Sequence, residues 1–339
     1  MPGEHPEARH GVEDHYFSSA HEFLNALSPR YEPLWRNNAT GWIFRGQADA
    51  SWQLQPGAVR DMRAFSKFGV SGESPNVPGV TTPAWRRRID LQQELLIRFM
   101  EGLDRSGLTI PWRPPTVSVF ARPEITSNAE PPPDALPLMA LAQHHGLPTM
   151  FLDWTRRAWV AAYFPAVEVA ERACEPTHLA VWALFRERLH DKGRRLKFYQ
   201  APGATDPNLH AQCGLFTLLA AENDPSLEEH IAQLLLESTG DTPLLRRLLL
   251  PASEARRLLR FLADEGVHGA SLFPGPDGVV RWMREGVLWE RATVSQEPSA
   301  AQQAVETDRP VIGSALRARV LGGKAAWRLL WWLRRCWMG

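Results

Sequence analysis

The order of its strand-like and helix-like segments constrains the fold of this chain most. Between residues 41 and 290, short apolar runs typical of strands and amphipathic helical patterns follow one another irregularly. Regular alternation would indicate a parallel wound sheet, whereas this order indicates a mixed sheet in an α+β domain. The expected strands are residues 42–47, 149–154, 179–184, 215–220, 245–250 and 270–273, with a further extended piece at 52–54. The expected helices are residues 21–27, 85–103, 135–146, 158–172, 226–237 and 254–264.

Local signals predict where several of these helices begin and end. Ser18 or Ser19 is expected to cap the first helix, and Ser253 a later one that Gly266 closes. Ser226, with Glu229 three residues on, has the spacing of a capping box.

Composition divides the rest of the chain into segments. Residues 1–40 read as a polar tail with a lead-in helix, and residues 41–290 as the folded domain. A proline-rich insertion at about 110–137 is expected to be extended. Residues 291–310, rich in Ser, Gln, Glu and Ala, read as a solvated linker.

The last segment, residues 311–339, has a character of its own. It holds six basic residues, four tryptophans and no acidic residue. On a helix, Ala326, Leu330, Leu333 and Trp337 would share one face, with basic residues on another. We expect an amphipathic helix that binds a membrane surface or a protein partner, or that packs on its own domain.

Composition also disfavours several classes of function. Lys+Arg and Asp+Glu both number 38, and this zero net charge makes a nucleic-acid partner unlikely. The three cysteines, Cys174, Cys213 and Cys336, have no metal-site spacing, so we expect free thiols and no metal. Residues 1–13 lack the apolar core of a signal peptide, and no apolar stretch would span a bilayer. The expected location is therefore cytoplasmic, with peripheral membrane contact through the C-terminal segment.

Three segments resemble the FRG domain, a family named for its aromatic-Arg-Gly motif. The first is WIFRGQ at residues 42–47. The second is LAQHHGLPT at 141–149, which continues into LDWT at 152–155 and AAYF at 161–164. The third is SLFP at 271–274, followed by Asp277 and Gly278. Their order covers most of residues 41–290, and the chain is identified as a member of this family.

A more distant resemblance is to the ADP-ribosyltransferase fold. That fold places an Arg-Gly at the end of a first core strand, a second strand before a V-A-x-x-F helix, and a third strand entered by Glu or Gln. Arg45-Gly46, then residues 153–164, then Gln212 appear here in that order. The resemblance implies an α+β fold with a split mixed β-sheet core flanked by helices. The sequence departs at Gln212, because a neutral amide cannot stabilise a ribosyl cation as a carboxylate does.

The residues themselves point to Arg45 as the centre of the site. Its planar guanidinium, between an apolar strand and a glycine, could bind a phosphate or carboxylate through two nitrogens. Alternatively, Arg45 is structural and pairs with a buried acid such as Asp153. The two roles are compatible, because Asp153 could orient Arg45 toward a ligand. Gly46 could allow a ligand to approach the backbone closely, or it could be a glycine for purely steric reasons. Gln47, in the same segment, is expected to line the same pocket.

The second motif supplies the other candidates. His144 and His145 end a helix, where one ring could touch a ligand or only pack or cap. Asp153 and Thr155 could bind a ligand or cap the next helix. Trp154 could stack on a base or pack in the core.

Three functions follow from these candidates. The leading hypothesis is a protein that binds a nucleotide-like anionic ligand such as NAD, with Arg45, Asp153 and Gln212 as catalytic candidates. Gly46, Gln47, His144, His145, Trp154 and Thr155 are the binding candidates. ADP-ribosyl transfer or NAD cleavage would be its chemistry. The alternatives are a non-catalytic sensor or adaptor, in phage defence or stress, and a nucleic-acid-binding protein.

Overall fold

The fold was determined from a computed structural model. It describes residues 12–35, 39–61, 63–70, 84–111, 131, 133–172, 176–189, 196–201, 207–219, 226–236 and 243–294. The predicted linker from residue 295 onward and the predicted amphipathic helix at 311–339 lie outside these residues. So does most of the proline-rich insertion.

The core is one mixed sheet of seven strands, in the order β1-β7-β4-β2-β3-β6-β5. β1 pairs with β7 in parallel, and every other pair is antiparallel. This arrangement confirms the predicted α+β fold with a mixed sheet. The strands are β1 Val12–Tyr16, β2 Trp42–Gln47, β3 Phe151–Thr155, β4 His178–Phe185, β5 Leu196–Tyr199, β6 Gly214–Leu219 and β7 Leu245–Pro251.

The sheet is split between β2 and β3. These two strands share a single register pair, Phe44 with Thr155, whereas β2 pairs with β4 along all six of its residues. Beyond that pair the two strands separate, so the backbone groups that would face each other there are not joined by a ladder. The split leaves a place in the middle of the sheet that side chains must fill.

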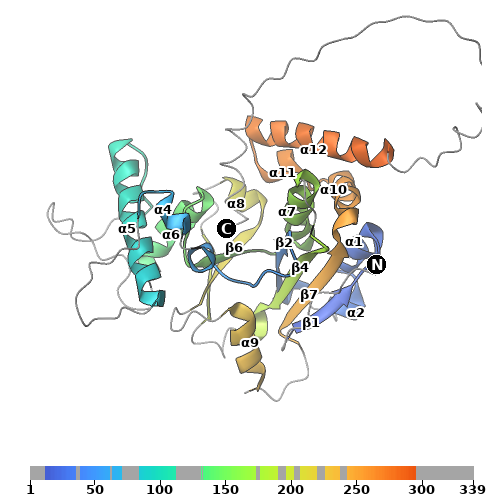
Figure 1. Cartoon of the computed structure of the whole chain (residues 1–339), viewed down its shortest axis with the longest axis horizontal. Coiled ribbons are helices and arrows are strands. Elements are labelled where there is room, and N and C mark those ends of the chain that lie inside the picture. Colours follow the sequence, from blue (N-terminus) through green and yellow to red (C-terminus); the bar gives the residue numbers. More distant parts are fainter. Residues whose placement is uncertain are drawn as a thin grey trace, which may run out of the picture.

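Helices cover the sheet in three groups around three apolar clusters. α1, α7 and α10 pack on the face that carries Phe44, and α11 and α12 lie above them (Figure 1). α5 and α6 pack beside Phe151 and Phe216, and α9 packs on the face that carries Ile43. These helices are α1 Ala20–Ala26, α5 Ala84–Arg105, α6 Leu136–His144, α7 Ala158–Glu171, α9 Leu227–Leu236, α10 Ala255–Asp264, α11 Gly269–Leu272 and α12 Pro276–Val294.

Short helices complete the described chain. They are α2 Glu32–Trp35, α3 Gly57–Arg60, α4 Arg63–Ser66 and α8 Pro207–Ala211, with 3-10 turns at Ala39–Gly41, Pro133–Ala135, Arg186–Arg188 and Ala252–Glu254. In the part of the chain that the structure describes, no helix has the length and apolar character needed to cross a bilayer.

The local signals gave mostly correct helix ends. Ser19 caps α1 by accepting from the Glu22 amide, and the Ser226–Glu229 capping box is present before α9. Gly266 ends α10 with φ +75, a left-handed conformation that glycine adopts without strain. The predicted Ser253 cap is wrong, because the N-cap of α10 is Glu254 and no side chain bonds there.

Two predicted extended pieces are wrong. Residues 52–54 form no strand, although Leu54 is buried. Residues 270–273 belong mostly to α11, which His268 and Ser271 begin with a reciprocal capping box. Helix α12 was not predicted, and it reaches Val294, so the helix extends into the segment read as linker.

Strand β1 was also not predicted, because its Val-Glu-Asp-His-Tyr sequence reads as polar tail. Glu13 and Asp14 face Arg246 and Arg247 across the parallel β1–β7 ladder, and ion pairs join each couple. These pairs offset the cost of placing charged residues in a strand. The sheet therefore begins within the first 40 residues.

Candidate functional site

Arg45 lies inside the sheet because β2 buries both of its faces. Successive strand residues point to opposite faces, so Phe44 and Gly46 point toward α7 while Ile43, Arg45 and Gln47 point to the other side. Every residue of β2 is buried, and Arg45 is only 1 % exposed. A long charged side chain in such a strand needs acceptors from its own protein or from a ligand.

The split supplies those acceptors through Asp153. Continued past the Phe44–Thr155 pair, the register would place Asp153 opposite Gly46. There Arg45 Nη1 donates to the Asp153 backbone oxygen at 3.1 Å and lies 3.5 Å from its carboxylate Oδ2. Arg45 Nε has no hydrogen-bond partner among the described residues. The guanidinium thus fills the split while using one of its three nitrogens.

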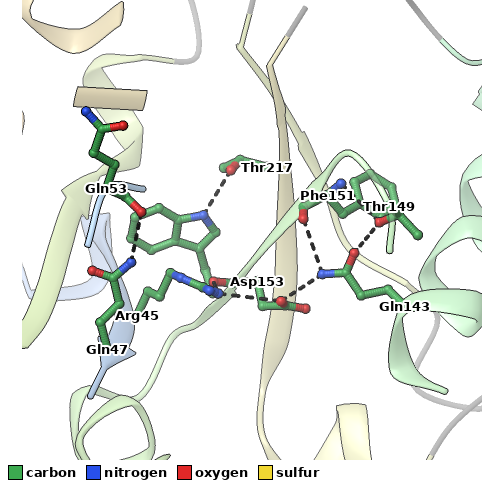
Figure 2. Close-up of polar contacts among 9 residues, drawn as sticks. Arg45, Gln47, Gln53, Gln143, Thr149, Phe151, Asp153 and Thr217 are labelled. Atoms are coloured by element: carbon green, nitrogen blue, oxygen red, sulfur yellow. Dashed lines mark hydrogen bonds and ion pairs between the residues drawn. The ribbon is translucent and has the colours of Figure 1, made fainter. Parts of the chain in front are cut away.

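A second set of hydrogen bonds reaches the same carboxylate oxygen, Asp153 Oδ2 (Figure 2). Gln143 Nε2 donates to Asp153 Oδ2 at 2.7 Å and to the Phe151 carbonyl at 3.3 Å. The Thr149 hydroxyl in turn donates to Gln143 Oε1. Gln143 and Thr149 are buried, so the chain Thr149–Gln143–Asp153–Arg45 is a polar network inside an apolar surround.

Burial and the contact between Arg45 and Asp153 have opposite effects on the pKa values of these two residues. Burial raises the pKa of Asp153 above its ordinary value, against the lowering effect of Arg45 and of the Gln143 hydrogen bond. Burial likewise lowers the pKa of Arg45, against the raising effect of Asp153. The cost of removing both groups from water therefore exceeds what their mutual contact returns.

A second arginine, Arg60, lies close enough to interact electrostatically with Arg45 and Asp153. Arg60, at the end of α3, is partly exposed. Burial, and secondarily the positive charge of Arg45, lower the pKa of Arg60 to about 10, while Asp153 and Glu168 oppose the change. Glu168 is itself paired with Arg172 along α7. The region thus gathers three arginines around two carboxylates.

Gly46 is required for packing. A Cβ at Gly46 would lie 2.0 Å from the Ala161 carbonyl oxygen and 2.4 Å from Pro165 Cδ, both in α7. Pro165 has no N–H, so that carbonyl lacks its usual helical donor. Gly46 therefore lets α7 lie directly against β2 beside Arg45, a steric role.

Gln47 and Trp154 are buried beside Arg45 and have partners within the protein. Gln47 accepts from Trp182 Nε1 at 2.7 Å and donates to the Gln53 carbonyl at 3.2 Å. Trp154 Nε1 donates to the Thr217 hydroxyl at 2.9 Å, and Trp154 is 0 % exposed. Both side chains pack and bond within the sheet in this structure.

Thr155 and Gln212 are joined to each other. The Thr155 hydroxyl donates to the Gln212 backbone oxygen at 2.7 Å and accepts from the Arg157 amide at 3.1 Å, which organises the entry to α7. The Gln212 side chain donates to the Leu272 carbonyl at 3.2 Å and is fully buried. The structure therefore brings Arg45 and Asp153 together, and points the Gln212 amide toward α11.

The two histidines lie at the end of α6. His144 Nε2 is 3.2 Å from Asn208 Nδ2, and the two histidine rings meet edge to face at 5.4 Å. His145 is the C-cap residue, and its ring lies 6.3 Å from that of Phe99. Within the described ranges, no group of three or more His, Cys, Asp or Glu residues could hold a metal ion.

Three residues near Arg45 were missed by reasoning from the sequence: Gln143, Thr149 and Arg60. Gln143 and Thr149 stand inside the second quoted motif, and a buried amide on an otherwise apolar helix is a usable signal. Arg60 stands in no motif, and only the fold brings it to the pair.

The comparisons with known proteins identify one domain family in this chain. The family model of the FRG domain matches residues 40–173. No curated protein and no solved structure matches the chain. The matched segment contains β2, α6, β3 and α7, and with them Arg45, Gln143, Thr149 and Asp153, whereas Gln212 lies beyond it. The chain is therefore an FRG domain-containing protein, and the buried Arg45–Asp153 network lies within that domain.

Proposed function

We propose that the protein binds a nucleotide-like anionic ligand, with NAD as the first candidate, at the split between β2 and β3. The observation that carries this proposal is the incomplete bonding of Arg45. Its guanidinium is enclosed, its Nε has no hydrogen-bond partner among the described residues, and its contact with the Asp153 carboxylate is long. An anionic oxygen is the group that such a guanidinium binds best.

Arg60 supports an anionic ligand. Arg60 is half-buried, with its Nε and Nη2 enclosed, and it lies within electrostatic range of Arg45 and Asp153. An anion bound at the split would therefore lie near two positive charges. Two nearby arginines suit a ligand with more than one anionic group, such as a pyrophosphate. Because Arg45 is 1 % exposed, binding requires the side chains around it to move.

Ligand-induced stabilisation tests this proposal. NAD or ADP-ribose should raise the melting temperature of the wild type, because a ligand that binds only the folded state stabilises it. Arg60→Gln should reduce the shift strongly, because it removes the second positive charge near the pair. Arg63→Gln is the matched control, since it removes the same charge from an exposed arginine on the neighbouring helix. An unchanged melting curve at saturating ligand, or equal shifts in both variants, would contradict the proposal.

Chemistry on the ligand is a further step. ADP-ribosyl transfer or NAD cleavage would place Asp153 at the ribosyl centre, with Arg45 on the pyrophosphate. Nicotinamide release from NAD is the direct assay, and Asp153→Asn should abolish it. The Gln212 amide bonds to the Leu272 carbonyl, so a catalytic role for Gln212 would need that bond to break.

One observation favours the non-catalytic alternative, a sensor or adaptor. The Asp153 carboxylate is held by Gln143 at 2.7 Å and lies beside Arg45, so the acid is engaged by its own protein. Ligand stabilisation without nicotinamide release would support this alternative.

A further inference from the structure

An exposed apolar face on α12 goes beyond the proposed ligand site. Five of the eight exposed large hydrophobic side chains of the described residues lie on this helix. Met283 is 65 % exposed, more than any other of the eight. α12 lies on the outside of the helical layer, above α11, α7 and α10 (Figure 1). The five are Val279, Val280, Trp282, Met283 and Val287, here called the α12 stripe.

The stripe follows from helical geometry. At 100° per residue, Val279, Met283 and Val287 fall within one quarter of the helix circumference. Val280 lies about 20° beyond one edge of that quarter and Trp282 about 60° beyond the other. The opposite side is fixed to the protein by Glu285, which is buried. Its carboxylate accepts from the Tyr163 hydroxyl at 2.5 Å and from the Gly269 amide at 3.1 Å. The helix therefore cannot roll to bury the stripe without breaking these bonds.

Gly286 adds a second observation. It lies within the stripe, in the interior of the helix, where glycine costs about 1 kcal/mol relative to alanine. A Cβ at Gly286 would meet nothing within 4 Å, so packing of the described residues does not require a glycine there. A small residue in an apolar stripe allows another helix to approach closely. The outer face of α12 thus has the form of a helix-binding surface.

We propose that residues 326–337 of the same chain pack as a helix on the α12 stripe. This segment has the complementary pattern, because Ala326, Leu330, Leu333 and Trp337 recur at helical spacing and would share one apolar face. The chain leaves α12 at Val294, and residues 295–325 form the connection. At about 3.3 Å per extended residue this connection can return along the whole helix.

The size of the stripe favours this tethered occupant over a second copy of the chain. Exposed side chains over about three helical turns offer an area on the order of a few hundred Å², below the roughly 800 Å² per partner of a standard stable interface. A segment tethered to the same helix needs less area, because tethering gives it a high effective concentration. Docking would leave the basic face of the segment directed outward.

Limited proteolysis of the full chain tests this docking. Trypsin cuts at Lys and Arg, and residues 326–337 contain Arg328, Arg334 and Arg335. Met283→Glu places a charge in the middle of the stripe and should speed cleavage at these arginines roughly tenfold, the change that 1.4 kcal/mol of lost packing gives. Leu108→Glu is the matched control, because Leu108 is also exposed and apolar but lies away from α12. It should leave the cleavage rate unchanged.

A second variant, in the docking segment and not in α12, tests the same contact in case Met283→Glu misfolds. Leu333→Glu lies outside the described fold and should speed the same cleavage equally. Equal cleavage in wild type and both stripe-directed variants would overturn the proposal. Protection that rises with protein concentration, or that appears only with anionic vesicles, would overturn it as well, because the occupant would then be a second copy or a membrane.

Discussion

Two buried arginines flank the same tryptophan in the sheet, and their surroundings differ. In the register of β2, β4 and β7, Arg45 and Arg247 lie on either side of Trp182. Their exposed fractions are 1 % and 0 %. Arg247 bonds through Nε and Nη2 to the two Asp14 carboxylate oxygens at 2.8 and 2.6 Å, and through Nη1 to the Ala50 carbonyl at 3.0 Å. Arg45 uses Nη1 alone.

The difference separates a structural arginine from one with unused binding capacity. The two-pronged contact of Arg247 with Asp14 is the geometry in which a guanidinium and a carboxylate satisfy each other best. Arg45 and Asp153 do not form that contact, because Arg45 reaches only Asp153 Oδ2, at 3.5 Å, and Gln143 donates to the same oxygen at 2.7 Å. Burial alone therefore does not identify a binding arginine. The number of its nitrogens that its own protein satisfies is more informative.

The largest expected effect is a loss of stability on substitution of Arg247, the structural arginine. Arg247→Leu should lower the free energy of unfolding by about 3–5 kcal/mol, because it removes the two bonds to the Asp14 carboxylate and the bond to the Ala50 carbonyl. Urea denaturation measures the loss as a lower midpoint at constant slope. A loss below about 1 kcal/mol would mean that the two-pronged contact is not what holds β1 to the sheet.

Arg45→Leu is the matched change on the other side of Trp182. It removes one hydrogen bond to a carbonyl and one long ion pair, and Asp153 keeps its hydrogen bond from Gln143. We therefore expect a smaller loss, about 1–3 kcal/mol. Denaturation under the same conditions gives the direct comparison. Equal losses for the two variants would break the comparison, because Arg45 would then be as fully used by the protein as Arg247.

The sequence alone predicted much of the domain that surrounds this comparison. Strand β2, strand β3 and helix α7 follow from apolar runs, with Gly46 ending the first run and Pro148 preceding the second. These local signals act within a few residues. The pairing of Arg45 with Asp153 was foreseen as one of two readings. The motif spacing also led to the FRG domain, which the family model matches over residues 40–173.

What could not be predicted depends on contacts between distant residues. Strand β1 reads as polar until Arg246 and Arg247 are placed beside its carboxylates, 233 residues away. No role was predicted for Gln143, because its bond to Asp153 depends on where β3 passes α6. Residues 270–273 form a short, largely apolar run bounded by Pro274, but the local capping box at His268 starts a helix there.

The smallest expected effect is a pH dependence of stability that comes from Asp153, the partner of Arg45. Burial raises the folded-state pKa of Asp153, so the folded chain holds this proton more tightly than the unfolded chain does. Stability contributed by the group therefore falls as pH rises from about 4, the ordinary value, through the raised pKa. Asp153→Asn carries no such charge. Its stability relative to wild type should rise over that window by about 1.4 kcal/mol for each unit of the pKa difference.

Urea denaturation across this pH range measures the relative stability, and Asp264→Asn, the same change at an exposed position that ends α10, is the control. A relative stability of Asp153→Asn that falls with rising pH would mean that Arg45 outweighs burial. The Arg45–Asp153 contact would then be a satisfied pair of the same kind as Arg247–Asp14. Arg45 would have little capacity left for a ligand, because its charge would already be compensated within the protein.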